Sequence, residues 1–508
     1  MRVLFIHGPR KFWPFIHEQD NYLVPQNLIC LAAYLRRENI ECKIIDCLPL
    51  HLGYKSLARR IIEYEPDVVA VGENHSMYAS EALKVLRLTK SIDSEIVTIA
   101  GGTHFANTVE WTLSSGVVDY VVIGEGEETL LELIRHIQDD ESNVDKVRGI
   151  AFKRDGETTL TEPRPLIENL DTLPMPAYDM LPMNLYGRSD YLFSPGGTTI
   201  HHSRGCTGRC SFCAFWVNNA ERRIVNGKIR LIPRFRTKSP EYTVEEVEYL
   251  YRVHNKRMMI FVDDSFNLLP EWNDRFSELM IKKNLPVGWF GFMRADCLLR
   301  DEKSGILEKM VRSGLTHICI GIERPEGEVL ESFNKKFYKP SITEEIIGVF
   351  RRKYPQVFLQ GTFIVGHRRE TRESLLSLGE YAKRLGLDFP AFHPLTPVPG
   401  TVMYDEAIAN GWLKGVDFEE FDWSTPVMDS EHLTREEILD ITAEITADYL
   451  KFDWILKGLT SPYKYKRNMY LWWLLVSAKV GIKNLYMRLN PLDPKNYHLL
   501  YKPDWYDD

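Results

Sequence analysis

The stretch that decides the fold is Ser203-Arg-Gly-Cys-Thr-Gly-Arg-Cys-Ser-Phe-Cys-Ala-Phe-Trp216, in which Cys206, Cys210 and Cys213 have the spacing C-x3-C-x2-C. Glycines at 205 and 208 let the backbone curl around the thiols, which in such a loop are metal or cluster ligands far more often than packing residues. A zinc site would need a fourth protein ligand at a regular spacing, and none lies nearby. Three cysteines can instead hold three irons of a 4Fe–4S cluster and leave the fourth iron open to a substrate or cofactor. Three buried cysteines clustered by chance are the less frequent alternative.

Composition limits what the rest of the chain can be. The chain has 508 residues, which is enough for two or three domains, and its net charge of −8 argues against a general nucleic-acid binder. Its eight cysteines do not form a disulfide framework, so we expect a reducing cytoplasm. The chain begins directly with a strand pattern and contains no uninterrupted apolar run of about 18 residues, so we expect neither a signal peptide nor a membrane span.

The first 160 residues alternate short apolar runs with amphipathic segments. Strict alternation of strand and helix indicates a doubly wound parallel sheet, in which ligands bind beyond the carboxyl ends of the strands. The turn Asp155-Gly156 predicts a β-hairpin within residues 148–160. The predicted strands are residues 3–6, 42–45, 68–71, 96–99 and 120–123, and two of the predicted helices are residues 27–35 and 81–88.

Glycines follow three of these strands, in Gly72-Glu-Asn-His75, Gly101-Gly-Thr-His104 and Gly124-Glu-Gly-Glu127. Glycine lets a bulky ligand, such as a nucleotide tail or a flat macrocycle, approach the backbone closely. Ordinary turn residues explain such glycines about half the time. The residues alone therefore leave both interpretations open.

A proline-rich linker, residues 161–194, precedes a second domain of residues 195–420. Six parallel strands with helices between them predict a barrel or part of one, with its chemistry at the carboxyl ends of the strands. The predicted strands are residues 198–200, 258–262, 287–292, 317–322, 358–365 and 389–393. Polar residues follow each of them: the cysteine loop, Asp263, Asp264, Arg294, Asp296, Glu323, Arg324, His367 and His393.

The first region resembles the cobalamin-binding domain of cobalamin-dependent radical S-adenosylmethionine (SAM) enzymes. The resemblance rests on Gly101-Gly-Thr-His104 and on Val122-Ile-Gly-Glu-Gly-Glu-Glu-Thr129. The D-x-H-x-x-G motif, whose histidine ligates cobalt from below, is absent, and we expect His75 and His104 to serve as hydrogen-bonding residues in preference to ligands. The residues that the resemblance assigns to the corrin and its nucleotide tail are Glu73, Asn74, His75, Ser76, Gly101, Gly102, Thr103, Gly124, Glu125, Gly126 and Glu127.

The second region resembles the radical SAM superfamily over nearly its whole length. The three cysteines with Phe212 carry this resemblance, together with the segments 261–266, 321–324, 361–371 and 395–401, whose order matches the cobalamin-dependent branch. The resemblance implies a 4Fe–4S cluster on Cys206, Cys210 and Cys213, with SAM chelating the open iron. The implied SAM contacts are Phe212, Asp264, Arg294, Glu323, Val365 and His393.

Three arginines depart from the family pattern. Arg368 and Arg369 replace the proline and glycine of G-x-P-G-E-T, and Arg324 stands where serine is common. We expect these arginines either to recognise a carboxylate or phosphate of the substrate or to be solvated charges at helix starts.

The last region, residues 421–508, is predicted to be helical. A capping box at Thr434 begins an amphipathic helix, and residues 463–476 join basic side chains to an aromatic, apolar stretch. Such a stretch usually docks on its own protein's core, while residues 463–489 leave a peripheral membrane contact or a cover for an apolar substrate open. Residues 501–508 are expected to be a tail.

The resemblance implies an enzyme that cleaves SAM to a 5′-deoxyadenosyl radical, removes hydrogen from a substrate carbon and transfers a methyl group from methylcobalamin. The alternative is an oxidative cyclase or ring-rearranging enzyme, as in the anaerobic magnesium-protoporphyrin monomethyl ester cyclase. An iron–sulfur electron-transfer or cluster-carrier protein is a third, less expected reading. We expect a small-molecule or lipid-like substrate, a low-potential electron donor such as ferredoxin or flavodoxin, and no nucleic-acid partner. The identity of the substrate stays open.

Overall fold

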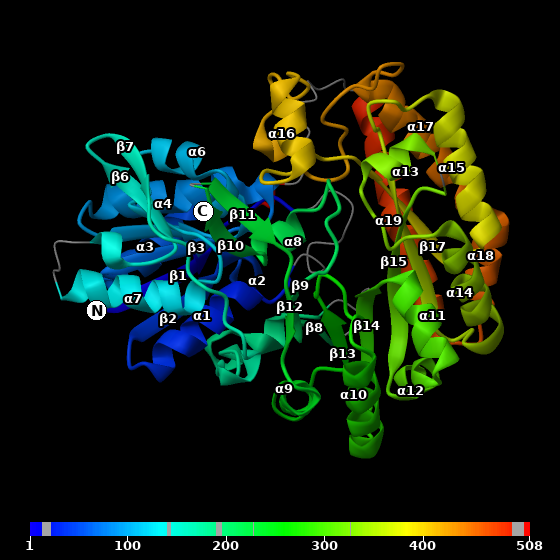
Figure 1. Ribbon diagram of the computed structural model, residues 1–508, viewed down its shortest axis with the longest axis horizontal. Coiled ribbons are helices and arrows are strands. Elements are labelled where there is room, and N and C mark those ends of the chain that lie inside the picture. The colour runs from blue at the N-terminus through cyan, green and yellow to red at the C-terminus, as the bar shows by residue number, and fades with distance from the viewer. Residues whose placement is uncertain (13–21, 140–143, 189–195, 227, 326, 490–501) are drawn as a thin grey trace.

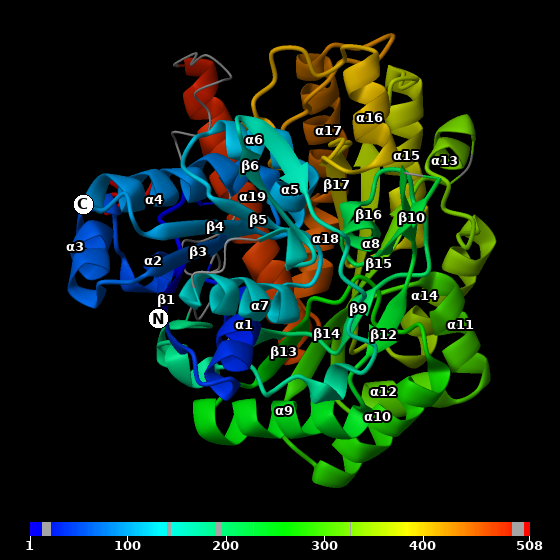
Figure 2. The same cartoon turned by 60° about the vertical axis from the view of Figure 1, so that its left-hand side comes forward.

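The computed structural model describes residues 1–12, 22–139, 144–188, 196–226, 228–325, 327–489 and 502–508. Two large sheets lie side by side in these residues, one built near the N-terminus and one from the middle of the chain (Figure 1). The segment that carries the three cysteines lies between them (Figures 1 and 2).

The first sheet has seven strands in the order β2-β1-β3-β4-β5-β6-β7. Strands β1 to β5 are parallel, which confirms the doubly wound sheet, and β6 and β7 add an antiparallel hairpin. The hairpin turns at Asp155 and Gly156 as predicted, because both residues adopt positive φ, 50° and 85°. The strands are β1 (Arg2–His7), β2 (Glu41–Asp46), β3 (Val68–Gly72), β4 (Val97–Gly101), β5 (Tyr120–Val122), β6 (Ile150–Arg154) and β7 (Glu157–Leu160).

Helices cover both faces of this sheet because its central strands are apolar on both sides. Val3 and Phe5 of β1 face one way and pack with α1 (Gln26–Arg37) and α7 (Gly126–Gln138). Leu4 and Ile6 face the other way and pack with α3 (Tyr54–Tyr64) and α4 (Ala79–Ile92). Three short helices, α2 (Cys47–Leu50), α5 (Thr103–Asn107) and α6 (Val109–Ser114), complete this region.

The second sheet has six parallel strands that neighbour one another in chain order. This arrangement confirms the predicted partial barrel. Its strands are β8 (Gly197–Ile200), β13 (Met258–Phe261), β14 (Gly288–Met293), β15 (Leu315–Glu323), β16 (Phe358–Val365) and β17 (Phe389–Pro394). The helices packed on its outer face are α9 (Pro240–His254), α10 (Pro270–Lys283), α11 (Ala295–Lys303), α12 (Ile306–Arg312), α14 (Pro340–Lys353) and α15 (Arg372–Leu385).

The C-terminal region supplies the helices α17 (Arg435–Tyr449), α18 (Phe452–Leu459) and α19 (Lys464–Leu489). The predicted capping box is present, since the side chain of Thr434 accepts from the Glu437 amide and Glu437 reaches back. The ring of Trp473 in α19 stacks on that of Phe389 in β17, with 3.4 Å between ring centroids. The aromatic stretch thus docks on the core of its own protein, which is the more frequent of the two outcomes expected from the sequence.

No described helix is both long and apolar enough to cross a membrane. The far end of α19 still exposes apolar side chains, because Ile482 is 69 % and Leu489 is 73 % accessible. A peripheral membrane contact through residues 463–489 therefore stays a prediction.

The prediction of a free tail is wrong for residues 502–508, because they pack against the first sheet's domain. Trp505 stacks on His51 with 5.5 Å between ring centroids, and the Ser56 amide donates to the Asp508 carbonyl at 3.0 Å. Docking removes the aromatic rings of Trp505 and Tyr506 from water, which lowers the free energy of the folded chain.

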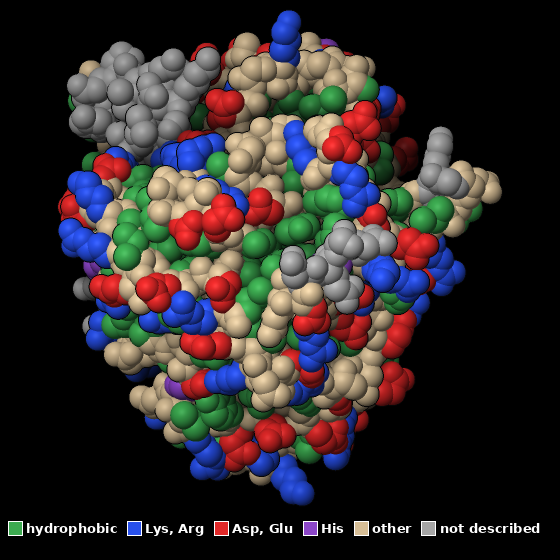
Figure 3. Space-filling model, turned by 90° about the vertical axis from the view of Figure 1, so that its left-hand side faces the viewer, with side chains coloured by type: hydrophobic (Ala, Val, Ile, Leu, Met, Phe, Trp, Pro, Cys, Tyr) green, Lys and Arg blue, Asp and Glu red, His purple; other side chains and the backbone are tan. Residues whose placement is uncertain are grey.

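Charged side chains of both signs are interspersed over the surface of the first domain. Figure 3 shows Lys and Arg alternating with Asp and Glu on this face. This distribution accords with a modest net charge of −8 for the whole chain.

Candidate functional site

The cysteine loop follows the carboxyl end of β8. Strand β9 (Ser203–Gly205) leads into the loop and pairs antiparallel with β12 (Phe235–Thr237), and helix α8 (Ala214–Asn218) follows it. Gly205 has φ +89°, and a Cβ there would lie 2.1 Å from the carbonyl oxygen of Arg234. Only glycine therefore fits at the entrance to the loop.

The three thiols belong to one short loop that hydrogen bonds hold in place. The Gly208 amide donates to Sγ of Cys206 at 3.4 Å, and the Cys213 amide donates to the Cys210 carbonyl at 3.2 Å. Burial raises the pKa of all three thiols, that of Cys210 to about 11. Metal binding offsets this cost because it replaces the thiol proton.

The three cysteines suit an iron–sulfur cluster, which takes one thiolate on each of three irons. Among the described residues, no three or more His, Cys, Asp or Glu side chains gather as ligands of one metal ion. A 4Fe–4S cluster does not need three side chains around one metal ion, because each of its thiolates binds a different iron. Arg294 and Lys335 both favour the thiolate form of Cys206, and their positive charges suit an anionic cluster.

Two adjacent aspartates follow β13 and play different parts. Asp263 is buried and accepts from the amides of His202 and Ser203 at 3.0 and 2.6 Å, so it holds the start of the cysteine loop. Asp264 accepts from Nδ2 of Asn219 at 3.2 Å. Burial, followed by the charge of Asp263, raises the pKa of Asp264 to about 7.

Arg294 and Glu323 lie near the cysteine loop, each held by a partner. Nη1 of Arg294 donates to Oγ1 of Thr207 inside the loop at 3.2 Å, and its guanidinium lies over the ring of Phe337. Glu323 accepts from Nζ of Lys335 at 2.7 Å and has a positive φ of 56°. A non-glycine residue in this conformation is strained, which is common at functional sites.

The other proposed SAM contacts lie at the ends of β16 and β17 and in the loop. The carbonyl of Val365 accepts from the Leu395 amide at 2.7 Å, and Phe212 packs on the buried ring of Phe333. Nδ1 of His393 lies 3.4 Å from the carbonyl oxygen of Trp423, and burial lowers the pKa of His393.

Both expectations for Arg324 are wrong. Arg324 is buried and pairs with the buried carboxylate of Glu370, so it is neither solvated nor free for a substrate. Arg369 pairs with Glu328 at the surface, and Arg368 donates to the Asp429 carbonyl at 2.5 Å. The buried carboxylate of Glu370 lies five residues beyond the end of β16, and it pairs with the arginine because an unpaired buried charge is costly.

A cavity of about 210 Å³ opens at the carboxyl edge of the first sheet, against α1 and α7. Gly102 has φ +91°, and a Cβ there would lie 2.6 Å from the Glu73 carbonyl oxygen. An apolar slot with glycine rims fits a planar organic group such as the tail of cobalamin. Its lining includes Phe5, Leu31, Val71, Ile99, Val122 and Leu130, with Asn74, Gly101, Gly102 and residues 124–127 at its rim.

The polar side chains of the rim largely satisfy one another. Glu73 is buried, pairs with Arg10 at 2.8 Å and accepts from the amides of Asn74 and His75. Oδ1 of Asn74 accepts from the amide of Thr103 at 3.0 Å. These contacts shape the loops and leave backbone and glycine surface toward the cavity.

His75 and His104, in the loops that follow β3 and β4, lie in packed surroundings. His104 is buried, with Nδ1 2.9 Å from Oγ of Ser76, and burial lowers its pKa to about 4. His75 lies edge-on to Trp423, with 5.1 Å between ring centroids. These contacts agree with the expected hydrogen-bonding role for His104.

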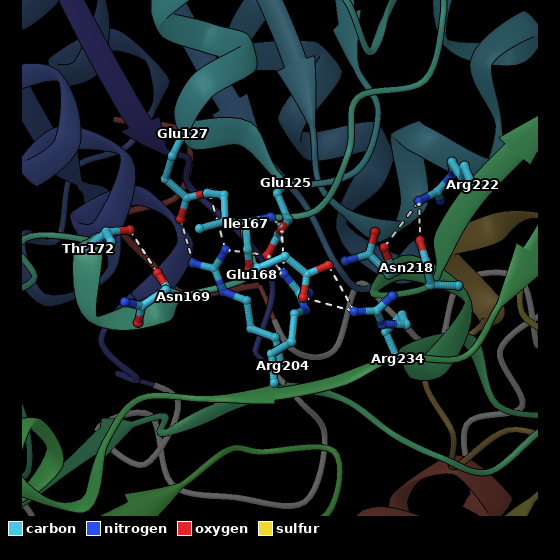
Figure 4. Close-up of polar contacts among 12 residues, drawn as sticks. Glu125, Glu127, Ile167, Glu168, Asn169, Thr172, Arg204, Asn218, Arg222 and Arg234 are labelled. Atoms are coloured by element: carbon cyan, nitrogen blue, oxygen red, sulfur yellow. Dashed lines mark hydrogen bonds and ion pairs between the residues drawn. The ribbon is translucent and has the colours of Figure 1, made fainter.

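Glu125 and Glu127 line the cavity, but their charges face the second sheet's domain (Figure 4). Arg204 of β9 donates to Glu125 at 2.7 Å and also pairs with Glu127, while Arg236 of β12 donates to Glu125 at 2.8 Å. These ion pairs join the two domains at the wall of the cavity and lower the pKa of Glu125 despite its burial.

Sequence reasoning missed Lys335 and Trp423. Nothing in the local pattern marks Lys335, which reaches back to the end of β15 from a loop. Trp423 lies outside the predicted catalytic domain, yet its ring contacts His75 of the first domain and Phe215 of α8, at 5.1 and 6.4 Å between centroids. Its φ of +57° could not be read from the sequence.

Comparison with known proteins agrees with this architecture. The B12 binding domain family matches residues 15–134, and the Radical SAM superfamily matches residues 200–382. An uncharacterized methyltransferase of Pyrococcus horikoshii is 30 % identical over 416 residues, which cover 82 % of this chain and 85 % of that protein. The anaerobic magnesium-protoporphyrin IX monomethyl ester cyclase of Rubrivivax gelatinosus is 27 % identical over 465 residues, covering 89 % and 77 %.

A solved structure shares the fold over most of its length. It is the radical S-adenosylmethionine methyltransferase TsrM from Kitasatospora setae, with a TM-score of 0.67, 14 % identity and coverage of 95 % of this chain and 99 % of that one. Fold and site together define a radical SAM enzyme with a B12-binding domain ahead of its partial barrel. The chain belongs to the family of cobalamin-dependent radical SAM enzymes.

Proposed function

We propose that this enzyme is a C-methyltransferase that uses cobalamin, SAM and a 4Fe–4S cluster to methylate a carbon of a small-molecule substrate. The observation that carries the proposal is the junction at Trp423. One side chain there contacts the loop after β3 of the B12-binding domain and the helix that follows the cysteine loop. Trp423 thus links the two candidate cofactor sites, and a transfer between them requires that they lie close together.

The residues divide between the cofactors as follows. Cys206, Cys210 and Cys213 would hold the cluster, with Phe212, Asp264, Arg294, Glu323, Val365 and His393 around SAM. The glycines and amides of the loops at 73–76, 101–103 and 124–127 would hold cobalamin. We propose domains at residues 1–160, 195–420 and 421–508, with 161–194 as a linker.

When bound, the cluster supplies the electron that cleaves SAM to methionine and a 5′-deoxyadenosyl radical, and cobalamin supplies a methyl carrier that a second SAM recharges. The protein's own part is positioning and exclusion of water. Arg294 and Lys335 place positive charge beside the cysteine loop, and Glu323 at the end of β15 offers a carboxylate held by Lys335. Asp264 lies at the same edge, with its pKa raised to about 7.

The substrate is proposed to meet apolar side chains at the mouth of the partial barrel. Phe292 packs edge-on to Phe290, whose side chain faces away from the outer helices, and Phe292 is 41 % accessible. Val262, just after β13, is also 41 % accessible. Exposed apolar side chains beside a candidate active site favour a substrate with an apolar part, small or lipid-like.

Oxidative cyclisation is the second candidate, because the Rubrivivax cyclase aligns with 89 % of this chain. Methyl transfer is preferred since the Pyrococcus relative, which is called a methyltransferase, is more similar and covers most of both chains.

The two candidates differ in what they make from SAM. A methyltransferase consumes one SAM as methyl donor and one as radical source, so it forms S-adenosylhomocysteine together with 5′-deoxyadenosine. Anaerobic incubation of the reconstituted enzyme with methyl-labelled SAM, reductant and candidate substrates should place label in the product. 5′-Deoxyadenosine formed with neither S-adenosylhomocysteine nor labelled product would contradict the proposal and favour the cyclase.

We also infer that the enzyme works in the reducing cytoplasm and receives electrons from a ferredoxin or flavodoxin. All eight cysteines are free thiols, which supports a reducing compartment. Reduction of the cluster by a purified flavodoxin system, compared with dithionite, tests the electron donor.

A further inference from the structure

Arg222 belongs to a hairpin that leaves the second domain and reaches the first. The hairpin consists of β10 (Glu221–Val225) and β11 (Lys228–Ile232) and directly follows α8. Arg222 is half-buried, and its Nη1 donates to the carbonyls of Asn218 and Ala220 at 3.3 and 3.5 Å. These contacts aim the guanidinium without neutralising it.

Four nearby arginines have carboxylate partners. Arg204 pairs with Glu125 and Glu127, and Arg236 pairs with Glu125. Arg234 pairs with Glu168, and Arg223 pairs with Glu221. Arg222 contacts no carboxylate among the residues that the structure describes, and Figure 4 shows it apart from these ion pairs. Burial accordingly lowers the pKa of Arg222 with no acidic group to oppose the effect.

This cation lies at the rim of the candidate cobalamin cavity. A Cβ on Gly124 would lie 3.6 Å from Nη1 of Arg222, so the guanidinium borders the loop after β5. Gly124, Asn218 and Asn219 all line the cavity. A half-buried guanidinium beside a glycine rim and two amide side chains is suited to an anion carried by whatever fills the cavity.

We propose that Arg222 binds the phosphodiester of the nucleotide tail of cobalamin and so lets the catalytic domain recognise the cofactor held by the first domain. This inference rests on the proposed use of cobalamin. The amide side chains of the corrin are neutral, whereas the tail phosphodiester carries one negative charge. A guanidinium can donate two parallel N–H bonds to it, and Gly124 leaves room for the phosphate at the backbone.

Two corrinoids test the proposal, because cobinamide lacks the nucleotide and its phosphate. Full-length, cluster-reconstituted, corrinoid-free enzyme is titrated with hydroxocobalamin and with cobinamide, and binding is followed by the corrin absorbance. Arg222→Gln should weaken hydroxocobalamin binding about 10- to 100-fold and leave cobinamide binding unchanged, since a charge-assisted hydrogen bond is lost only with the former. Arg222→Lys should lose less hydroxocobalamin affinity than Arg222→Gln, because lysine keeps the positive charge.

Arg223→Gln is the matched control, since Arg223 is the next residue on the same strand but is exposed and pairs with Glu221. It should leave both affinities unchanged. Unchanged hydroxocobalamin binding in Arg222→Gln would overturn the inference and leave the proposed function intact. Equal weakening of both corrinoids would mean that the hairpin acts through folding, which also overturns it. Failure of the wild type to bind either corrinoid would overturn the proposed function as well.

Discussion

The parallel strands of the two sheets have their carboxyl ends at the same junction, yet these two edges differ in the residues that they present. The first edge presents glycines, backbone and an apolar slot, with its polar groups tied to one another in contacts such as Asn74 to Thr103. The second edge presents three thiols with Asp264, Arg294, Glu323 and Lys335 around them. The first suits a large, mostly neutral organic cofactor, and the second suits charged ligands and a cluster.

The junction between the edges is held by charge on one side and by aromatic packing on the other. Arg204 and Arg236 clamp Glu125 and Glu127, whereas Trp423 packs between His75 and Phe215. The ion pairs cross the domain boundary, and the aromatic contacts connect the loop after β3 with α8. We therefore expect one set of residues to recognise each cofactor and a different set to align the two.

The largest expected difference follows removal of one thiol. Cys210→Ala should abolish cluster assembly and lower SAM cleavage at least about 1000-fold, while cobalamin binding stays near wild type. Iron and sulfide analysis, 5′-deoxyadenosine formation and corrin absorbance measure the three effects. Cys297→Ala, a buried cysteine outside the loop, is the control. Loss of cobalamin binding in Cys210→Ala would show that the edges are not independent.

The reverse experiment breaks the first edge. Gly102→Ala forces a side chain into a left-handed residue against the Glu73 carbonyl, which costs about 1–3 kcal/mol and should weaken cobalamin binding about 10-fold or more. Iron content should not change. Gly156→Ala is the matched control because Gly156 also has positive φ, 85°, but has nothing within 4 Å of an added Cβ. Equal effects of the two substitutions would contradict a role for the Gly102 contact.

Trp423 tests alignment apart from recognition. Trp423→Ala should leave iron content and cobalamin binding intact. It should raise the ratio of 5′-deoxyadenosine to S-adenosylhomocysteine about 10-fold, because the ring that contacts both His75 and Phe215 no longer aligns the two cofactor sites. Trp423→Phe should retain most of the coupling. An unchanged ratio in Trp423→Ala would show that Trp423 does not help to align the two cofactor sites.

The smallest effect is a pH dependence confined to the first domain. Glu81 of α4 is buried beside Lys11 and Tyr506, and burial raises its pKa to about 7. Because the folded state holds this proton more tightly than the unfolded state, the stabilisation is present in full below pH about 4.5 and is lost as pH rises through 7.

The wild type should therefore lose about 1 kcal/mol of stability relative to Glu81→Gln between pH 6 and 8. Melting temperatures of both proteins at the two pH values measure it. A gap that does not change with pH would show that Glu81 is ionised in the folded protein throughout this range.

Much of the fold could be predicted from periodicity because each strand is a short apolar run bounded by turns. All eleven predicted strands are present within one or two residues of their predicted ends. Partners separated by long stretches of chain could not be predicted. Arg236 and Glu125 are 111 residues apart, and residues 502–508 dock on a helix that starts at Tyr54.

The sequence by itself determined the cysteine loop, the glycine loops and the two sheet patterns, because these depend on residue type and local spacing. Only the tertiary structure decided which arginines form an ion pair with a carboxylate. Arg324 and Arg222 look alike in the sequence, yet Arg324 is neutralised by the buried Glu370, whereas Arg222 donates to two carbonyl oxygens and contacts no carboxylate in the described part of the chain. The difference depends on which side chains the folded chain brings within a few ångströms, and electrostatic energy falls off with that distance.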